Sequence, residues 1–283
     1  MRSDSGNQPV YSTDAKQSPP EATVLFMDDF SANELDRSKW NVRLTGAVYN
    51  NEQQAYVDSS EIIYVATEQE APGAKGGALV FHPRYRPGHV SPEGDRFDFV
   101  SGRIDTRDRF DFRHGTAAAR VMLPSGPGLW PAFWLLGYGG WPESGEIDVL
   151  EYVGEPDWVS AAVHGPGYFG EAGLVNKLFF PTGYDAKAWH VYSVDWSPDR
   201  LTFKVDDLTI FRVTRPMAAF FGPWAFDNNK YLILNFALGG TYPFKTNGID
   251  TPYYGLPEST VQMIRDGKVR MMVDWVQVRR YLG

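Results

Sequence analysis

Three carboxylates lie within six residues of the segment 144–154, SGEIDVLEYVG, and aliphatic residues separate them. The aliphatic positions predict a buried strand, on which alternate side chains point to opposite faces, so Glu146 and Asp148 share one face. Strict alternation would turn Glu151 toward the core, where an unpaired carboxylate is costly. A β-bulge of one residue between Asp148 and Glu151 would return Glu151 to the acidic face. We therefore expect three carboxylates in a row on one surface.

Three explanations compete for this row of acids. A solvent-exposed face is the simplest, but like charges two residues apart repel, so the arrangement opposes stability unless something uses it. A metal site would use the carboxylates as ligands, although calcium loops take theirs from turns rich in Asp, Asn and Gly rather than from an aliphatic strand. Glycoside hydrolysis is the third explanation, and it needs one ionised and one protonated carboxyl group.

The spacing of the outer two acids favours glycoside hydrolysis. With the bulge, Glu146 and Glu151 are four pleat positions apart, which puts their Cα atoms roughly 13 Å apart at about 3.3 Å per residue. Side chains that lean toward each other can bring the carboxyl groups to about 5 Å, the separation of retaining enzymes, whereas inverting enzymes need a wider gap. The negative charge of Asp148 between them would raise the pKa of a neighbour and orient the nucleophile.

The composition indicates an all-β protein that positions these acids. The 283 residues include 28 glycines and nine tryptophans, and long helical periodicity is hard to find. About a dozen short strands without a fixed repeat favour one two-sheet β-sandwich or jelly roll with a concave face. Residues 99–112 are expected to form one half-exposed strand, and short helices only at 215–221 and 258–265. Residues 1–22 are predicted to be a disordered tail, and residues 23–283 a single domain.

Charge and cysteine content exclude several functions. A net charge of −8 argues against a general binder of nucleic acid or of anionic membranes, which requires a basic face. The absence of cysteine removes disulfides, thiolate zinc sites and thiol nucleophiles. No apolar run is long enough to span a bilayer, and the first residues lack the apolar core of a signal peptide, so an exported protein would have lost its signal.

Six segments, in this order along the chain, carry a resemblance to glycoside hydrolase family 16, in particular to its laminarinase-like (endo-β-1,3-glucanase) branch. EIDVLE matches the family motif Glu-x-Asp-x-x-Glu at all three acids, while the form without the bulge resembles lichenases and plant xyloglucan enzymes. The likeness runs from about residue 24 to 280. The segments are NNEQQAY (50–56), SGRI (101–104), GLWPAFWLLG (128–137), WPESGEIDVLEYVG (141–154), HGPGY (164–168) and LNFALGG (234–240).

The resemblance implies a concanavalin A-like jelly roll with a cleft across its concave sheet. It also implies that β-1,3-glucan is cleaved internally with retention, by double displacement. In the family, the residues that match Glu146, Glu151 and Asp148 are the nucleophile, the acid/base and the assisting carboxylate. Hydrolysis of another β-glycan, such as mixed-linkage glucan or an agarose-type galactan, is one alternative. A glucan-binding protein without activity is another, but such proteins lack the catalytic acids that are intact here.

Six further residues are implied as substrate-binding. Tryptophans matching Trp130 and Trp134 line the glycone side of the cleft in relatives, with core packing as the alternative. Polar residues matching Asn50 and Arg103 hydrogen-bond sugar hydroxyls, with a turn or a salt bridge as the alternative.

Trp141 and His164 flank the catalytic strand, where His164 would assist the acid/base or have a structural role.

The resemblance also bears on cofactors, partners and location. Many family members bind one structural calcium on the convex side, and Asp274 fits the position of its aspartate ligand, although a salt bridge would explain that residue too. Catalysis should need no cofactor. The expected partner is a polysaccharide, and the expected protein is a monomer that works outside the cell or at its surface.

Overall fold

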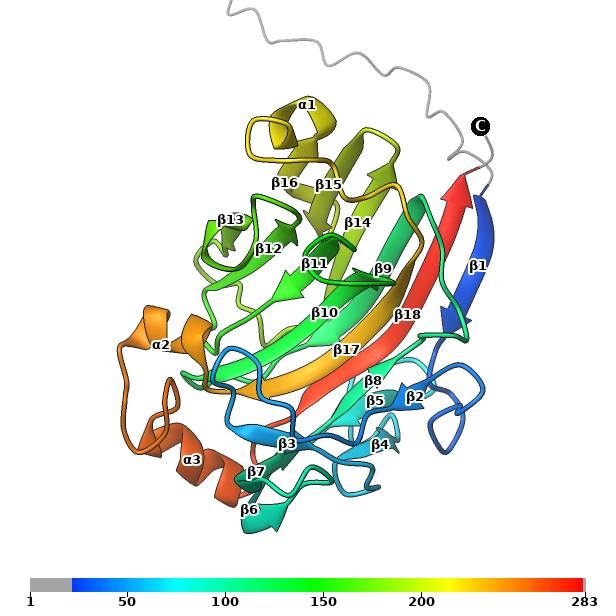
Figure 1. The fold of residues 1–283 in the computed structure, drawn as a ribbon. Coiled ribbons are helices and arrows are strands. Elements are labelled where there is room, and N and C mark those ends of the chain that lie inside the picture. The colour runs from blue at the N-terminus through cyan, green and yellow to red at the C-terminus, as the bar shows by residue number, and fades with distance from the viewer. Residues whose placement is uncertain (1–21, 282–283) are drawn as a thin grey trace, which may run out of the picture.

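The computed structural model describes residues 22–281, and its first strand, β1 (Ala22–Asp28), begins at the first of them. The tail predicted over 1–22 therefore lies, apart from Ala22, outside the described residues, and the domain boundary at residues 22 and 23 stays a prediction. Strand β1 pairs with β18 (Met271–Tyr281), so the first and last strands of the described chain lie side by side (Figure 1). No helix in the described part is long and apolar enough to cross a membrane.

The sheet that carries the acidic strand has seven strands, and they pair antiparallel. The strands in its middle are far apart in the chain, because β17, near the C-terminal end, lies between β10 and β8. The strands in spatial order are β13 (Leu174–Phe179), β12 (Trp158–His164), β11 (Glu146–Glu151), β10 (Leu129–Gly137), β17 (Lys230–Leu238), β8 (Arg103–Asp105) and β2 (Asn41–Val42).

A second large sheet packs against the first (Figure 1). In it, β18 pairs with both β9 and β5, and β1 branches from β18. Its other strands in spatial order are β16 (Leu208–Thr214), β15 (Arg200–Val205), β14 (His190–Ser197), β9 (Gly115–Met122), β5 (Ala78–Phe81) and β4 (Ile63–Ala66).

Smaller elements close the ends of the sandwich. Three strands, β3 (Gln54–Tyr56), β7 (Arg96–Ser101) and β6 (Arg84–Val90), form a third sheet in which β3 and β7 are parallel. The helical elements are a 3₁₀ turn at Gly170–Ala172, α1 (Arg215–Ala218), α2 (Thr241–Asn247) and α3 (Glu258–Arg265).

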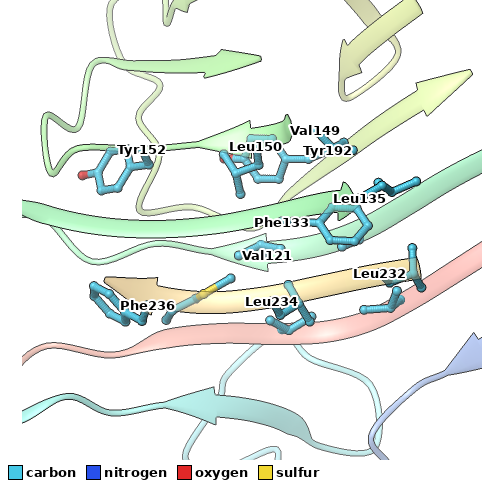
Figure 2. Close-up of a cluster of buried hydrophobic side chains, with 14 of the residues drawn as sticks. Val121, Phe133, Leu135, Val149, Leu150, Tyr152, Tyr192, Leu232, Leu234 and Phe236 are labelled. Carbon is cyan, nitrogen blue, oxygen red and sulfur yellow. The ribbon is translucent and has the colours of Figure 1, made fainter. Parts of the chain in front are cut away.

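The core lies between the two large sheets. Figure 2 shows Phe133, Val149 and Leu234 from the seven-stranded sheet together with Val121 and Tyr192 from the other. All five are buried, and they belong to one continuous hydrophobic cluster. On β10 and β17 the residues that alternate with this inward set face away from the core, which leaves the outer face of the seven-stranded sheet for function.

The predicted all-β, two-sheet fold class is confirmed, and two local expectations are wrong. The strand expected over 99–112 is two strands, β7 and β8, and Gly102 separates them. A Cβ atom at Gly102 would lie 2.6 Å from Ile63 and 2.8 Å from Phe81, so the close packing at this break requires glycine. Strand β13, at the sheet edge, was missed. Helix α2 was also missed, since glycines at 240 and 248 bound a segment with little apolar periodicity.

Candidate active site

The bulge predicted in the acidic strand is present. Against β12, Asp148 pairs with Ala162 and Glu151 pairs with Ser160, so three steps along β11 match two along its neighbour. Against β10, the register skips Val149. Val149 and Leu150 are consequently both buried (Figure 2), and Glu151 returns to the face that Glu146 and Asp148 occupy.

Two tryptophans of β10 stand on the same face as the acids. The indole N–H of Trp130 donates to Oε1 of Glu151 over 3.2 Å, and its ring meets Tyr242 edge to face at 5.7 Å. Trp134 pairs in register with Asp148. Both tryptophans are half-buried, so the core-packing alternative does not describe them.

Trp134 is held by a chain of polar contacts. Its indole N–H donates to Oδ1 of Asn235 over 2.7 Å, and Nδ2 of Asn235 donates to the Tyr56 hydroxyl over 3.0 Å. The guanidinium of Arg103 lies over the Trp134 ring at 5.0 Å, and Nε of Arg103 is buried without a hydrogen-bond partner among the described residues. An unpaired buried donor beside an aromatic face suits a sugar hydroxyl.

Asn50 lies on a loop before β3 with a left-handed backbone (φ 52°). Its carbonyl accepts hydrogen bonds from the backbone N–H and the hydroxyl of Thr241, at 2.7 and 3.0 Å. The adjacent Gly240 lies against both Asn50 and the ring of Trp130. The structure thus places Asn50 near Trp130, and its backbone fulfils the turn role given as the alternative.

His164 is the last residue of β12, which flanks β11 on the side away from β10, and Trp141 lies beside it. Nε2 of His164 is 3.4 Å from Oδ2 of Asp148 and 4.0 Å from Oε1 of Glu146. Burial lowers the pKa of His164 to about 4, so the imidazole is neutral near pH 7 and these contacts are not ion pairs. Trp141 is 47% exposed and lies 6.2 Å from the His164 ring and 5.3 Å from the Phe169 ring.

Burial raises the pKa of all three carboxyl groups. The pKa rises to about 7 for Glu146 and for Glu151, and that of Asp148 lies well above its usual value, because burial and the charges of the two glutamates oppose its ionisation. Neighbouring carboxylates on one buried face cannot all ionise together near neutral pH. The site therefore holds protons that isolated side chains would have lost.

The surroundings distinguish the two glutamates. Hydrogen bonds from Asp148 and Trp141 and the positive charges of Arg103 and Lys230 lower the pKa of Glu146, against its burial. The charge of Glu146 instead raises the pKa of Glu151, and only the Trp130 hydrogen bond opposes this. Glu146 is thus favoured as the ionised group and Glu151 as the protonated one.

A metal ion is a weaker explanation for this cluster. Glu146, Asp148 and His164 offer donor atoms within 4.8 Å of one another, which is close enough to share an ion. Metal-bound histidines almost always donate their second ring N–H to a partner, whereas Nδ1 of His164 is buried with none among the described residues. Carboxylate ligands must also be deprotonated, and burial here opposes that. The arrangement favours proton chemistry.

Asp274 does not fit a calcium site. Its Oδ1 accepts from the backbone N–H of Lys75 at 2.8 Å, and its Oδ2 accepts from Arg120 at 2.5 Å. The same Arg120 nitrogen donates to the Gly73 carbonyl at 2.8 Å. A guanidinium therefore already bridges the carboxylate and a carbonyl, and the salt-bridge alternative describes Asp274.

Five residues of the site or its immediate support were not singled out from the sequence: Tyr56, Ser160, Lys230, Asn235 and Tyr242. Tyr56 and Asn235 belong to the segments NNEQQAY and LNFALGG, so a polar residue within an apolar strand was a usable signal for Asn235. The Ser160 and Tyr242 hydroxyls are 3.0 Å apart beside Glu151, and 82 residues separate them in sequence. Lys230 had no local signal at all.

A cavity of about 760 Å³ lies away from these acids, where Phe112, His114 and Trp196 are among its lining residues. The acids instead stand on the face of a sheet. A polymer that extends past the reacting bond needs such a face more than it needs an enclosing cavity, so we assign the chemistry to the acids.

Comparison with known proteins identifies the relatives of this chain. Residues 46–242 match the sequence profile of glycosyl hydrolases family 16. A beta-glucanase from Rhodothermus marinus is 30% identical over 288 residues, covering 96% of this chain and 90% of the relative. The X-ray structure of an endo-beta-1,3-glucanase from Pyrococcus furiosus superimposes with a TM-score of 0.79 at 30% identity, over 93% of this chain and 96% of that one. A beta-1,3-glucan-binding protein from Penaeus monodon is 37% identical over 286 residues, covering 80% of this chain and 76% of the relative.

Proposed function

Because this chain belongs to glycosyl hydrolases family 16, we propose that it is an endo-acting, retaining hydrolase of β-1,3-glucan. The observation that carries the mechanism is the bulge of β11, which puts Glu146, Asp148 and Glu151 on one face in environments that separate their protonation states. The substrate is inferred from the glucanases to which the chain is similar.

In the first step, Glu151 gives its proton to the glycosidic oxygen while the bond from that oxygen to the anomeric carbon breaks. The Glu146 carboxylate attacks the same carbon and forms a glycosyl ester with the enzyme. The protein prepares both groups, since Arg103 and Lys230 favour the charge on Glu146 while the charge of Glu146 keeps the proton on Glu151.

In the second step, the Glu151 carboxylate takes a proton from a water molecule, whose oxygen attacks the anomeric carbon and releases Glu146. Two inversions give net retention. Asp148 stays beside the nucleophile, and because burial and the charges of the two glutamates raise its pKa well above the usual value, it can donate a hydrogen bond to the Glu146 carboxylate.

Trp130, Trp134 and Arg103 supply the binding surface on the glycone side in this proposal. Half-buried indole rings offer apolar faces on which a pyranose ring can stack, and the unpaired Nε of Arg103 offers a donor. Trp141, exposed on the opposite side of β11, is assigned to the leaving-group side.

The test is a substrate panel with analysis of the products. Release of reducing ends from laminarin should exceed release from lichenan, agarose and arabinogalactan, and early products should be a range of oligosaccharides. Proton NMR should show the β-anomer first. Cleavage of a galactan alone would overturn the glucan assignment, and binding without turnover on every polymer would favour a glucan-binding protein instead.

We also propose that the protein acts as a monomer outside the cell or at its surface. The three acids and their aromatic neighbours all come from one chain, so one chain suffices for the chemistry, and a polymeric substrate is too large to enter a cell. Light scattering coupled to size exclusion would measure the oligomeric state, and fractionation of the source cells would measure the location.

A further inference from the structure

Lys230, the first residue of β17, is fully buried, and its ammonium donates to four oxygens. The acceptors are the carbonyls of Ser144 at 2.7 Å, Gly145 at 3.1 Å and Ala225 at 3.2 Å, and Oδ1 of Asn228 at 2.8 Å. Four acceptors around three N–H donors are sufficient to hold the charged form. A buried cation without a direct carboxylate partner costs stability, so its retention calls for a functional reason.

The four oxygens belong to the two segments that meet just before the catalytic strand. Ser144 and Gly145 lead directly into Glu146, and Nδ2 of Asn228 donates to the same Ser144 carbonyl over 2.9 Å. Gly145 has a left-handed backbone (φ 68°), and a side chain there would collide with the Ala225 carbonyl. The ammonium is therefore the common anchor for the backbone from which Glu146 projects.

The charge of Lys230 also reaches Glu146. Burial lowers the pKa of Lys230 to about 7 and the charge of Glu146 raises it, while the charge of Lys230 lowers the pKa of Glu146 in turn. Aromatic faces add support, with the Lys230 ammonium 5.4 Å from the Phe226 ring and 5.9 Å from the Trp196 ring. The other polar groups that influence or face Glu146 are Asp148 and Glu151 on its own strand, His164 on β12, Arg103 on β8 and Trp141 on the preceding loop.

We propose that Lys230 is a positioning residue for the nucleophile: its ammonium fixes the backbone that leads into β11 and places a positive charge where that strand begins. The proposal rests on the hydrolytic function argued above. Substitution of a merely structural residue would change the stability and the rate without changing the pH at which Glu146 ionises. Substitution of Lys230 should change that pH as well.

The test compares three variants by the acidic limb of kcat/KM against pH, which reports the ionisation of the free enzyme's nucleophile. Lys230→Met removes the charge. Asn228→Ala removes one acceptor and the hydrogen bond to Ser144 while keeping the charge, and Asn228→Asp adds an opposing charge beside Lys230. We expect the acidic limb to move up by about 0.5–1 pH unit in Lys230→Met and Asn228→Asp and to stay in place in Asn228→Ala. The rate should fall roughly 10–100-fold in Lys230→Met, since small displacements of reacting groups are costly.

The ionisation of Glu146 can also be followed without turnover, by ¹³C NMR of carboxyl-labelled glutamate, with Glu146→Gln identifying the signal. If Lys230→Met does not fold, the comparison of Asn228→Asp with Asn228→Ala decides the question. If the charge variants fold and their acidic limb and NMR titration coincide with those of the wild type, the proposed role of Lys230 is overturned. The proposed hydrolytic function is not affected by that result. A wild type that cleaves no glycan would overturn the function instead, whatever the NMR titration shows.

Discussion

The indole N–H of Trp130 donates a hydrogen bond to Oε1 of Glu151 over 3.2 Å. The bond stabilises the ionised carboxylate, so it lowers a pKa that burial and the charge of Glu146 raise to about 7. In the proposed mechanism, Trp130 would therefore both stack on the substrate and help to set the pH above which Glu151 loses its proton.

Trp130→Phe should move the alkaline limb of the pH profile upward. Phenylalanine keeps an aromatic ring on the face that carries the three acids but cannot donate a hydrogen bond to Glu151, so the pKa of Glu151 should rise. The fall of kcat/KM at high pH should then begin about 0.5–1 unit higher than in the wild type. Trp134→Phe is the matched control, because the Trp134 N–H donates to Asn235 instead. Equal shifts in the two variants would contradict the assignment of Trp130.

Glu151→Gln should separate the two halves of the reaction. The variant cannot protonate a sugar leaving group, so hydrolysis of laminarin should fall roughly 10²–10⁴-fold while binding of laminari-oligosaccharides persists. A substrate with an acidic aryl leaving group needs little protonation and should still form the glycosyl-enzyme. Glu146→Gln is the control, since it removes the nucleophile and should be inactive on both substrates. A Glu151→Gln variant as slow on the aryl glycoside as on laminarin would refute the general-acid role.

The sequence alone predicted the central feature of the site. In EIDVLE, two consecutive aliphatic residues precede Glu151, so the chain had to bury either both aliphatics or a carboxylate, and a bulge is the cheaper outcome. These are local patterns, in which the period of a strand and the cost of burying charge leave few alternatives.

Contacts across the fold could not be read in this way. Arg120 and Asp274 are 154 residues apart, and Lys230 meets the Ser144 carbonyl across 86 residues. No spacing along the chain distinguishes such a lysine from a surface lysine. The Arg120 partner of Asp274 was identifiable only from the three-dimensional pairing of β9 with β18, so the sequence could not choose between a salt bridge and a calcium ligand.

Asp148→Asn should stabilise the protein while lowering its activity. The raised carboxyl pKa values mean that the folded protein holds protons that the unfolded chain releases near pH 4, so these groups favour folding at low pH and progressively less as the pH rises toward about 7. Asparagine cannot ionise, so it removes from this balance the cost of keeping Asp148 protonated in the folded state.

We expect the melting temperature of Asp148→Asn at pH 8 to exceed that of the wild type by roughly 2–4 °C, corresponding to about 1 kcal/mol, and the difference to shrink at pH 4.5. Thermal unfolding followed by circular dichroism at both pH values measures this. A variant less stable than the wild type at pH 8 would show that the Asp148 carboxyl group contributes favourably to folding.

Arg120→Met should destabilise the protein by about 3 kcal/mol, because it leaves the buried Asp274 carboxylate without its ion partner. A chelator should leave the melting temperature of the wild type unchanged, since the guanidinium bridges the groups that a cation would need. Addition of calcium to Arg120→Met tests the point from the other side. A wild type destabilised by the chelator, together with a calcium-rescued variant, would return Asp274 to a metal-binding role.

Trp141→Phe should move the acidic limb of the pH profile upward with little loss of stability. Trp141 is 47% exposed, so its contribution to the core is small, but its side chain lowers the pKa of Glu146 as a hydrogen-bond donor. Phenylalanine keeps an aromatic ring and loses the donor, so Glu146 should need a higher pH, by about 0.5 unit, to ionise. Phe169→Ala is the matched control, since this exposed ring packs against Trp141 and is not among the groups that shift the pKa of Glu146. Phe169→Ala should raise KM, because Trp141 loses the ring that packs against it, and should leave the acidic limb in place. If the limb moves in Phe169→Ala but not in Trp141→Phe, shielding from water by the two rings, rather than the indole N–H, sets the ionisation of Glu146.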